Sequence, residues 1–287
     1  MINKKMNKFL RFIYFKLVKI LTQIIAYFGY ELDVNISKKL PSNNKLEINL
    51  NIGAGSYIIQ GFKSLDFYSE HYYPDKNKFL KERINYDIRH DYIPSKDNSI
   101  DNIYISHVIE HIEDEYVSKF INDAYRVLKP GGVIRIVCPD SKFIFEVSQF
   151  QNQFWTWRHR LFYDKDQYTT DWDSIESYDF LMRELSTPNC RYYNNKIDRD
   201  NFDLDRLKNL NFKDFTSLVK QNLAFRSAYP GDHISIWDFD TLKQLGTAAG
   251  FSHIIDSKRF GSVSLTMQSR KFDKVGPQMS LYVDMVK

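Results

Sequence analysis

Short apolar runs alternate with a segment of helical periodicity between residues 45 and 140. Five of these runs are predicted to be strands, because they are short and mostly apolar. They span residues 46–52, 62–67, 83–87, 100–106 and 133–138. Residues 109–128 repeat apolar side chains at helical spacing, and Lys129-Pro130-Gly131-Gly132 ends that helix, since Pro cannot continue a helix and Gly permits a left-handed turn. The alternation predicts an α/β domain around a mostly parallel sheet.

The first 30 residues follow a different pattern. Residues 6–28 have helical periodicity, with basic side chains gathered on one side and apolar side chains on the other. The longest uncharged run, residues 20–30, is too short for a membrane span, which needs roughly 20 residues. Lys16 and Lys19 interrupt the apolar stretch that a signal peptide would need. We expect residues 1–36 to form a basic amphipathic helix that packs on its own domain, forms a homodimer or lies on the inner face of the cell membrane.

Charge and cysteine content narrow the function classes. Residues 1–30 hold six basic residues and no acidic one, which leaves 34 basic and 36 acidic residues in the rest of the chain. The body is therefore not a general polyanion binder, and we expect no nucleic-acid partner. Two cysteines among 287 residues cannot build a disulfide framework or a four-thiolate zinc site, which fits a cytoplasmic location.

A glycine-rich turn directly follows the first predicted strand. Gly53-Ala54-Gly55 would let the backbone approach a ligand at the carboxyl end of that strand. A dinucleotide fingerprint would need Gly where Ile58 stands, and a phosphate-binding loop would need Gly-Lys-Ser/Thr, so NAD is disfavoured and the phosphate-binding loop is excluded. Asp66 and Asp87 end the next two strands at the same edge, where carboxylates could accept from ribose hydroxyls and an adenine amine.

These motifs resemble those of class I S-adenosylmethionine-dependent methyltransferases, in the small-molecule branch. The resemblance is carried by residues 50–55, 64–66 and 86–88, and more specifically by residues 97–112 and 125–136. It implies a Rossmann-like seven-stranded, mostly parallel sheet with helices on both faces, a final hairpin at 251–257 and 279–285, and S-adenosylmethionine as the cofactor. It also implies the cofactor contacts, at Asn51, Gly53, Ala54, Gly55, Asp66, Asp87, Ile88, Ser106 and His107.

Two departures from that family pattern concern the loop after the first strand. Ser56 stands where many members have a third glycine. Only ten residues separate Gly55 from Asp66, too few for a usual crossover helix, for which roughly a dozen or more are typical. We therefore predict a shortened or absent first helix.

Methyl transfer to a hydroxyl group needs a base, and the unperturbed pKa of His, near 6.5, suits that task. The candidates lie in loops at the carboxyl edge of the predicted sheet. They are His107, His111, Asp140, Asp232 and His233, of which His233 and His111 rank first. His107-x-x-Glu110-His111 also matches an inverted zincin pattern. Because that match begins at a strand end, where helical geometry need not hold, we predict no metal site.

About 95 residues, 141–235, separate the fifth strand from the helix at 239–250. They are rich in Trp, Tyr and Arg, which suit sugar rings and phosphate or carboxylate groups. We expect a helical acceptor-binding insertion there, with residues 37–140 and 236–287 forming the cofactor-binding core.

The resulting functional hypothesis is O-methylation of a small-molecule or sugar acceptor in capsule or lipopolysaccharide biosynthesis, because similar chains are typical of bacterial surface-polysaccharide assembly. The acceptor would be a sugar, a nucleotide sugar or a sugar-linked phosphate. The alternatives are an RNA or other nucleic-acid methyltransferase and a non-catalytic cofactor-binding scaffold.

Overall fold

The structure is a computed structural model, and it describes residues 47–70, 72–149, 154–158, 175–190, 204–221 and 223–287. The predicted N-terminal helix at 1–36 lies outside the described residues. Among the helices of the described part, none combines the length and the apolar character that crossing a membrane requires.

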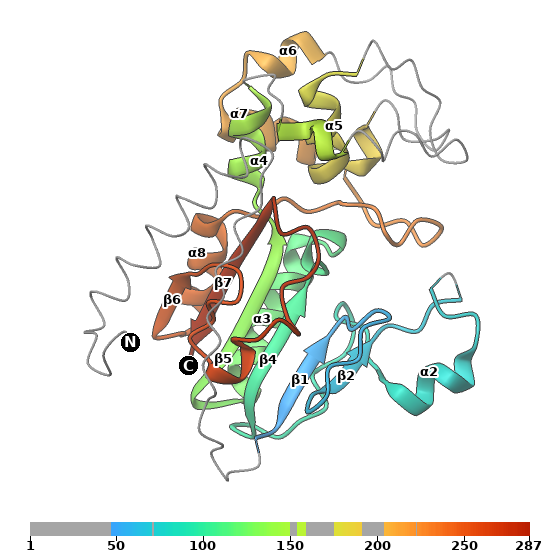
Figure 1. Cartoon of the computed structure of the whole chain (residues 1–287), viewed down its shortest axis with the longest axis vertical. Coiled ribbons are helices and arrows are strands. Elements are labelled where there is room, and N and C mark those ends of the chain that lie inside the picture. The colour runs from blue at the N-terminus through green and yellow to red at the C-terminus, as the bar shows by residue number, and fades with distance from the viewer. Residues whose placement is uncertain (1–46, 71, 150–153, 159–174, 191–203, 222) are drawn as a thin grey trace.

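A single sheet of seven strands runs in the order β3-β2-β1-β4-β5-β7-β6 (Figure 1). The strands are β1 (Asn49–Ile52), β2 (Lys63–Asp66), β3 (Ile84–Asn85), β4 (Ile100–Ser106), β5 (Leu128–Pro139), β6 (His253–Asp256) and β7 (Ser280–Val286). All neighbouring pairs are parallel except β5–β7 and β6–β7, which are antiparallel. This arrangement confirms the predicted fold class, although β3 is three residues shorter than expected.

Two helices cover one face of the sheet. They are α3 (Asp114–Val127) and α8 (Phe239–Ala249), which contact each other and pack over β5, β6 and β7. Alternate residues of β4, among them Ile103 and Ile105, are buried beneath them, as the two-residue repeat of a strand requires. Asp238 caps the start of α8 by accepting from the Thr241 amide, and Gly250 ends it with a left-handed φ of 98°.

In the described part of the chain, loops cover the centre of the opposite face, where the sequence predicts helices. Tyr104 and Tyr282, which point away from α3, are buried against Ile59, Met267 and Phe272. Among the described residues, the connection between β1 and β2 contains no helix, as its length predicted, and the segment 257–279 holds only the short η6 (Leu265–Met267). A short helix, α2 (Lys76–Glu82), lies in the connection between β2 and β3 (Figure 1).

The helix predicted over residues 109–128 is in fact two elements. A 3-10 turn, η1 (Ile109–His111), is separated from α3 by the extended Ile112. The carbonyls of the turn are bonded elsewhere, because Glu110 O accepts from the amides of Ile234 and Ser235. Trp237 Nε1 likewise donates to Ile109 O at 3.1 Å. Docking on the segment 232–237 therefore replaces the expected continuous helix.

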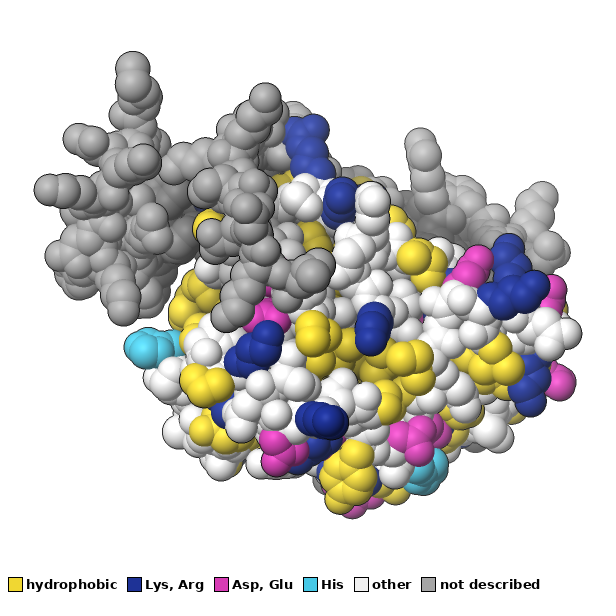
Figure 2. All heavy atoms as spheres, turned by 90° about the horizontal axis from the view of Figure 1, so that it is seen from below, with side chains coloured by type: hydrophobic (Ala, Val, Ile, Leu, Met, Phe, Trp, Pro, Cys, Tyr) yellow, Lys and Arg dark blue, Asp and Glu magenta, His cyan; other side chains and the backbone are white. Residues whose placement is uncertain are grey.

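The described part of the segment 141–235 is helical and lies beyond the carboxyl ends of the parallel strands (Figure 1). It contains α4 (Ser141–Ser148), α5 (Ser177–Leu185), η4 (Thr187–Asn189), α6 (Leu204–Lys208) and α7 (Phe212–Lys220). These elements bury their own apolar cluster, which includes Trp155, Phe180 and Phe215. At the other end of the molecule, basic, acidic and apolar side chains of the described residues are interspersed (Figure 2).

Candidate active site

A cavity of about 500 Å³ opens at the carboxyl ends of β1, β2 and β4. Its lining includes six of the nine residues that the sequence predicted for a cofactor: Gly53, Gly55, Asp66, Asp87, Ile88 and His107. The volume lies in the usual range of small-molecule sites, about 300–1,000 Å³. The carboxyl edge of the sheet therefore brings these predicted residues together, as expected for an open α/β fold.

The two glycines after β1 are required for different reasons. Both have a positive φ, 63° at Gly53 and 54° at Gly55. A Cβ atom on Gly53 would lie 2.2 Å from Val108 Cγ2, so Gly53 allows the loop after β4 to approach. A Cβ atom on Gly55 would meet no atom within 4 Å. Gly55 thus leaves open space beside the backbone, which is what a bound cofactor needs.

Asp66, at the end of β2, is held by the loop that follows β1 and by Tyr73. Its Oδ2 accepts from the Gly55 amide at 2.7 Å and from the Tyr73 hydroxyl at 2.5 Å. Burial, together with the hydrogen bond to Asp66, raises the pKa of Tyr73. Arg83 closes the same loop by donating to Gly55 O at 2.7 Å. Asp66 Oδ1 accepts from the Phe67 amide at 2.8 Å. Because a carboxylate has about four acceptor sites, Asp66 retains about one for a ribose hydroxyl. Its geometry fits the predicted cofactor role.

Asp87 has a partner that the sequence analysis did not identify. Both of its oxygens accept from Arg89, at 3.1 Å each. The Arg89 guanidinium in turn lies 3.8 Å from the ring centre of Phe225 and 5.4 Å from that of Phe67. Phe67 directly follows Asp66, and Arg89 lies two residues after Asp87, so the sequence could have indicated both as residues of the cofactor site. Phe225 is remote in sequence and carries no such signal.

A second cavity of about 640 Å³ adjoins the first, and Gly53, Gly55, Ser56, His107 and His111 line both. Of the predicted cofactor residues, Asn51, Ala54 and Ser106 line only this second cavity. Its other walls come from the described part of the segment 141–235 and from residues 271–279. Two joined cavities of this kind suit a reaction between two ligands.

His107 stands between the two cavities in a strained conformation. Its φ is 53°, which is rare for a residue other than glycine. Nδ1 lies 3.0 Å from Glu110 Oε1, and Nε2 lies 3.0 Å from Ser280 Oγ. With both nitrogens engaged, His107 is fixed in place.

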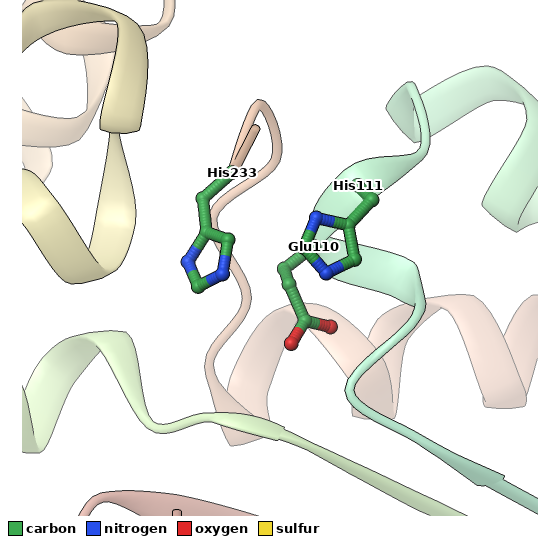
Figure 3. Close-up of side chains that lie close together, drawn as sticks. All are labelled: Glu110, His111 and His233. Atoms are coloured by element: carbon green, nitrogen blue, oxygen red, sulfur yellow. The ribbon is translucent and has the colours of Figure 1, made fainter. Parts of the chain in front are cut away.

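His111 and His233, the two leading base candidates, meet at the second cavity with ring centres 4.8 Å apart. Figure 3 shows them with Glu110 between η1 and the loop that precedes α8. Burial, and secondarily the charge of His111, lowers the pKa of His233 to about 3, so His233 is neutral at physiological pH. Burial opposes ionisation of Glu110, but the charges of His107 and His111 prevail and lower its pKa to about 2.

Asp140, the third catalytic candidate, has a different position. It caps α4, because its side chain accepts from the Phe143 amide at 3.2 Å, and it is not among the residues that line the two cavities. The geometry therefore offers His111 and His233, rather than Asp140, to a ligand in the second cavity.

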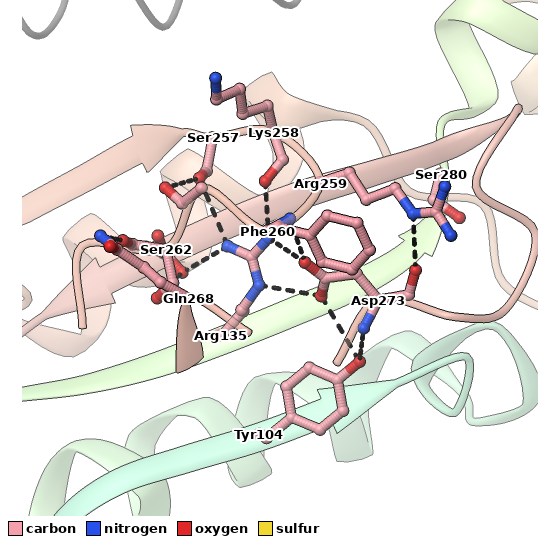
Figure 4. A network of polar contacts seen from close by, with 12 residues as sticks. Tyr104, Arg135, Ser257, Lys258, Arg259, Phe260, Ser262, Gln268, Asp273 and Ser280 are labelled. Carbon is pink, nitrogen blue, oxygen red and sulfur yellow. Dashed lines mark hydrogen bonds and ion pairs between the residues drawn. The ribbon is translucent and has the colours of Figure 1, made fainter. Parts of the chain in front are cut away.

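A buried charge network supports the wall of the second cavity (Figure 4). Arg135 on β5 donates to Asp273 at 2.7 and 3.0 Å and to Asp284 at 3.0 Å, and all three side chains are fully buried. The Asp273 carboxylate also accepts from the Phe260 amide at 2.7 Å. The network ties the segment 257–279 to the sheet.

Comparison with known proteins gives one family match. Residues 64–136 match the family model described as "Methyltransferase domain". No curated protein sequence matches the chain at a significant level.

Similar solved structures include S-adenosylmethionine-dependent methyltransferases from three organisms. The one from Archaeoglobus fulgidus is 15% identical over 97% of this chain and 99% of that chain, with a TM-score of 0.41. The one from Mesorhizobium loti is 12% identical over 84% and 90%, with a TM-score of 0.38. The one from Thermotoga maritima, titled a possible histamine N-methyltransferase, is 14% identical over 96% and 97%, with a TM-score of 0.38.

Residues 64–136 thus match a methyltransferase domain, and the sheet order and the loop after β1 agree with the cofactor-binding fold that the sequence predicted for this part of the chain.

Proposed function

We propose that the protein is an S-adenosylmethionine-dependent methyltransferase that O-methylates a sugar, a nucleotide sugar or a sugar-linked phosphate in capsule or lipopolysaccharide assembly. The observation that carries the proposal is the second cavity, which adjoins the cofactor cavity and is lined by both histidines and by four basic side chains. In this proposal residues 37–140 and 236–287 bind the cofactor, and residues 141–235 help to bind the acceptor.

The charges of the second cavity favour an anionic acceptor. Its basic residues are Arg158, Arg183, Lys271 and Lys274, and its acidic residues are Glu110, Glu184 and Asp273. Two of those acids already have basic partners, since Glu184 accepts from Arg158 at 2.7 Å and Asp273 pairs with Arg135. The net charge of the other charged side chains that line the cavity is positive, and Lys and Arg side chains are the usual ligands of phosphate and carboxylate groups.

In the proposed reaction His233 and His111 hold the acceptor hydroxyl and take its proton. A neutral imidazole is the form that can accept a proton. Burial makes His233 neutral but also a weak base, so in this proposal His233 orients the hydroxyl and His111 takes the proton. The bound cofactor supplies an electrophilic methyl group on its sulfonium centre. Positioning the acceptor beside that group is the main task of the two cavities, because orientation alone can lower a barrier by roughly 7–11 kcal/mol.

A nucleic-acid substrate is less well supported. Residues 31–287 hold 34 basic and 36 acidic residues, whereas nucleic-acid binding usually needs a predominantly basic surface. We propose a cytoplasmic enzyme, with residues 1–36 providing contact with the inner membrane or with a second copy of the chain.

The test is an acceptor screen with the full-length protein and S-adenosylmethionine, in which demethylated cofactor and methylated product are measured together. Nucleotide sugars and sugar phosphates are expected to be methylated, and neutral sugars and short RNAs are not. Changing Lys271 and Lys274 to Met should raise KM for an anionic acceptor about tenfold, which corresponds to about 1.4 kcal/mol. Lys243→Met on α8 is the matched control. Methylation of RNA alone, with steep salt dependence, would refute the proposal.

A further inference from the structure

Three potential metal ligands come together at the border of the two cavities. One nitrogen from each of His111 and His233 and one oxygen of Glu110 lie within 4.8 Å of one another. Ligands of a tetrahedral ion lie about 3.3 Å apart, given bonds of about 2.0–2.1 Å. Small side-chain rotations would therefore close the three groups around an ion (Figure 3).

The hydrogen bonds of both histidines leave the same ring nitrogen available. His111 Nδ1 lies 3.0 Å from Asp232 O, and His233 Nδ1 lies 2.5 Å from Glu184 O. Because a carbonyl only accepts, each Nδ1 carries the hydrogen, and Nε2 is the nitrogen that each ring has left for a metal ion. Histidines that ligate metals typically have this arrangement, in which a backbone carbonyl fixes the tautomer and the ring orientation.

Glu110 supplies the second, independent observation. Its side chain is only 2% exposed, and Oε1 faces His107 Nδ1 at 3.0 Å. Among the described residues, Oε2 has no hydrogen-bond partner. A buried carboxylate oxygen without a partner is costly, and a cation beside it would remove that cost.

We propose that His111, His233 and Glu110 bind one divalent first-row transition-metal ion, such as Mn²⁺, Fe²⁺, Co²⁺ or Zn²⁺. Two imidazole nitrogens and one carboxylate suit these ions, whereas Mg²⁺ and Ca²⁺ prefer oxygen ligands alone. Three protein ligands leave positions open for ligands in the second cavity. With the ion bound, His111 and His233 would be ligands and not bases. In a step that rests on the proposed function, an acceptor hydroxyl bound to the ion would lose its proton to solvent in the second cavity more readily.

The test titrates untagged full-length protein, previously treated with a chelator and dialysed, with Co²⁺. Visible absorption reports the coordination, and elemental analysis after dialysis gives the stoichiometry. We expect one equivalent of Co²⁺ per chain, displaced by Zn²⁺. His233→Ala and Glu110→Gln should each lose at least about 90% of that binding. The matched control is His253→Ala, because His253 is an exposed histidine on β6, and it should bind as the unchanged protein does.

Calorimetry with S-adenosylmethionine shows whether each variant is folded. If Glu110→Gln does not fold, His111→Ala replaces it. The proposal is overturned if the unchanged protein binds neither Co²⁺ nor Zn²⁺ stoichiometrically, or if folded variants keep the full equivalent. Because metal binding is measured without any acceptor, its failure is distinguishable from failure of the proposed acceptor class.

Discussion

Replacing Arg135 by Met should destabilise the protein strongly. The Arg135 side chain is fully buried and donates to two fully buried carboxylates, at 2.7 Å to Asp273 and at 3.0 Å to Asp284. The substitution leaves both acids without their cation. Breaking a buried ion pair typically costs about 3–5 kcal/mol. For a chain of this size, that loss lowers Tm by about 6–20 °C.

The assay is chemical unfolding followed by tryptophan fluorescence, with thermal unfolding as a second measurement. Lys271→Met, an exposed change on the segment 257–279 that the network holds, is the control and should alter stability by less than about 0.5 kcal/mol. Adding Asp273→Asn and Asp284→Asn to the Arg135→Met protein should recover about half of the lost stability, because amides remove the unpaired charges. The buried charges, rather than lost packing, would then account for the cost.

A loss below about 3 kcal/mol for Arg135→Met would refute this reasoning, since the energetic argument requires at least the lower limit of the range for a broken buried pair. A triple variant no more stable than the single one would refute the assignment of the cost to unpaired charge.

Three further predictions concern the cofactor loop and one buried lysine. Gly53→Ala should lose about 1–3 kcal/mol of stability and bind S-adenosylmethionine more weakly in calorimetry, because the new Cβ would lie 2.2 Å from Val108. The control is Gly61→Ala, which should cost less stability because φ is also positive there but no atom lies near the new Cβ. Asp66→Asn should raise the calorimetric Kd for S-adenosylmethionine at least about tenfold, and an unchanged Kd would exclude the ribose role of Asp66. Burial lowers the pKa of Lys258 to about 8 from 10.5, so the unfolded chain binds more protons between these values and stability rises with pH there. Lys258→Met should therefore stabilise the protein by about 1–3 kcal/mol at pH 7 and by much less near pH 10.5, as urea unfolding at the two pH values will show.

Local sequence predicted the sheet because its strands are short, apolar and bounded by turn residues. The connection between Gly55 and Asp66 is too short for a helix, and the structure contains none there. α8 ends at Ala249, one residue before the predicted end, since Gly250 adopts the left-handed conformation that ends a helix. In these cases the deciding interactions lie within a few residues of one another, so periodicity and turn chemistry were sufficient.

Contacts between distant segments account for the features that the sequence did not predict. η1 is separate from α3 because the segment 232–237 donates hydrogen bonds to the carbonyls of η1. No local sequence pattern predicts that contact. Arg135 and its partners Asp273 and Asp284 are separated by 138 and 149 residues. A single Arg inside an otherwise apolar strand was a signal of a buried charge, but it did not identify the acids that neutralise it.

The histidines show how a local motif can indicate the right chemistry with the wrong partners. The pattern His107-x-x-Glu110-His111 pairs two histidines four residues apart, as on a helix. In the structure the positive φ of His107 directs its ring toward Glu110 and Ser280. The histidine beside His111 is instead His233, whose ring centre lies 4.8 Å away. The break between η1 and α3 and the docking of the segment 232–237 on that turn are therefore what assemble Glu110, His111 and His233 into one cluster.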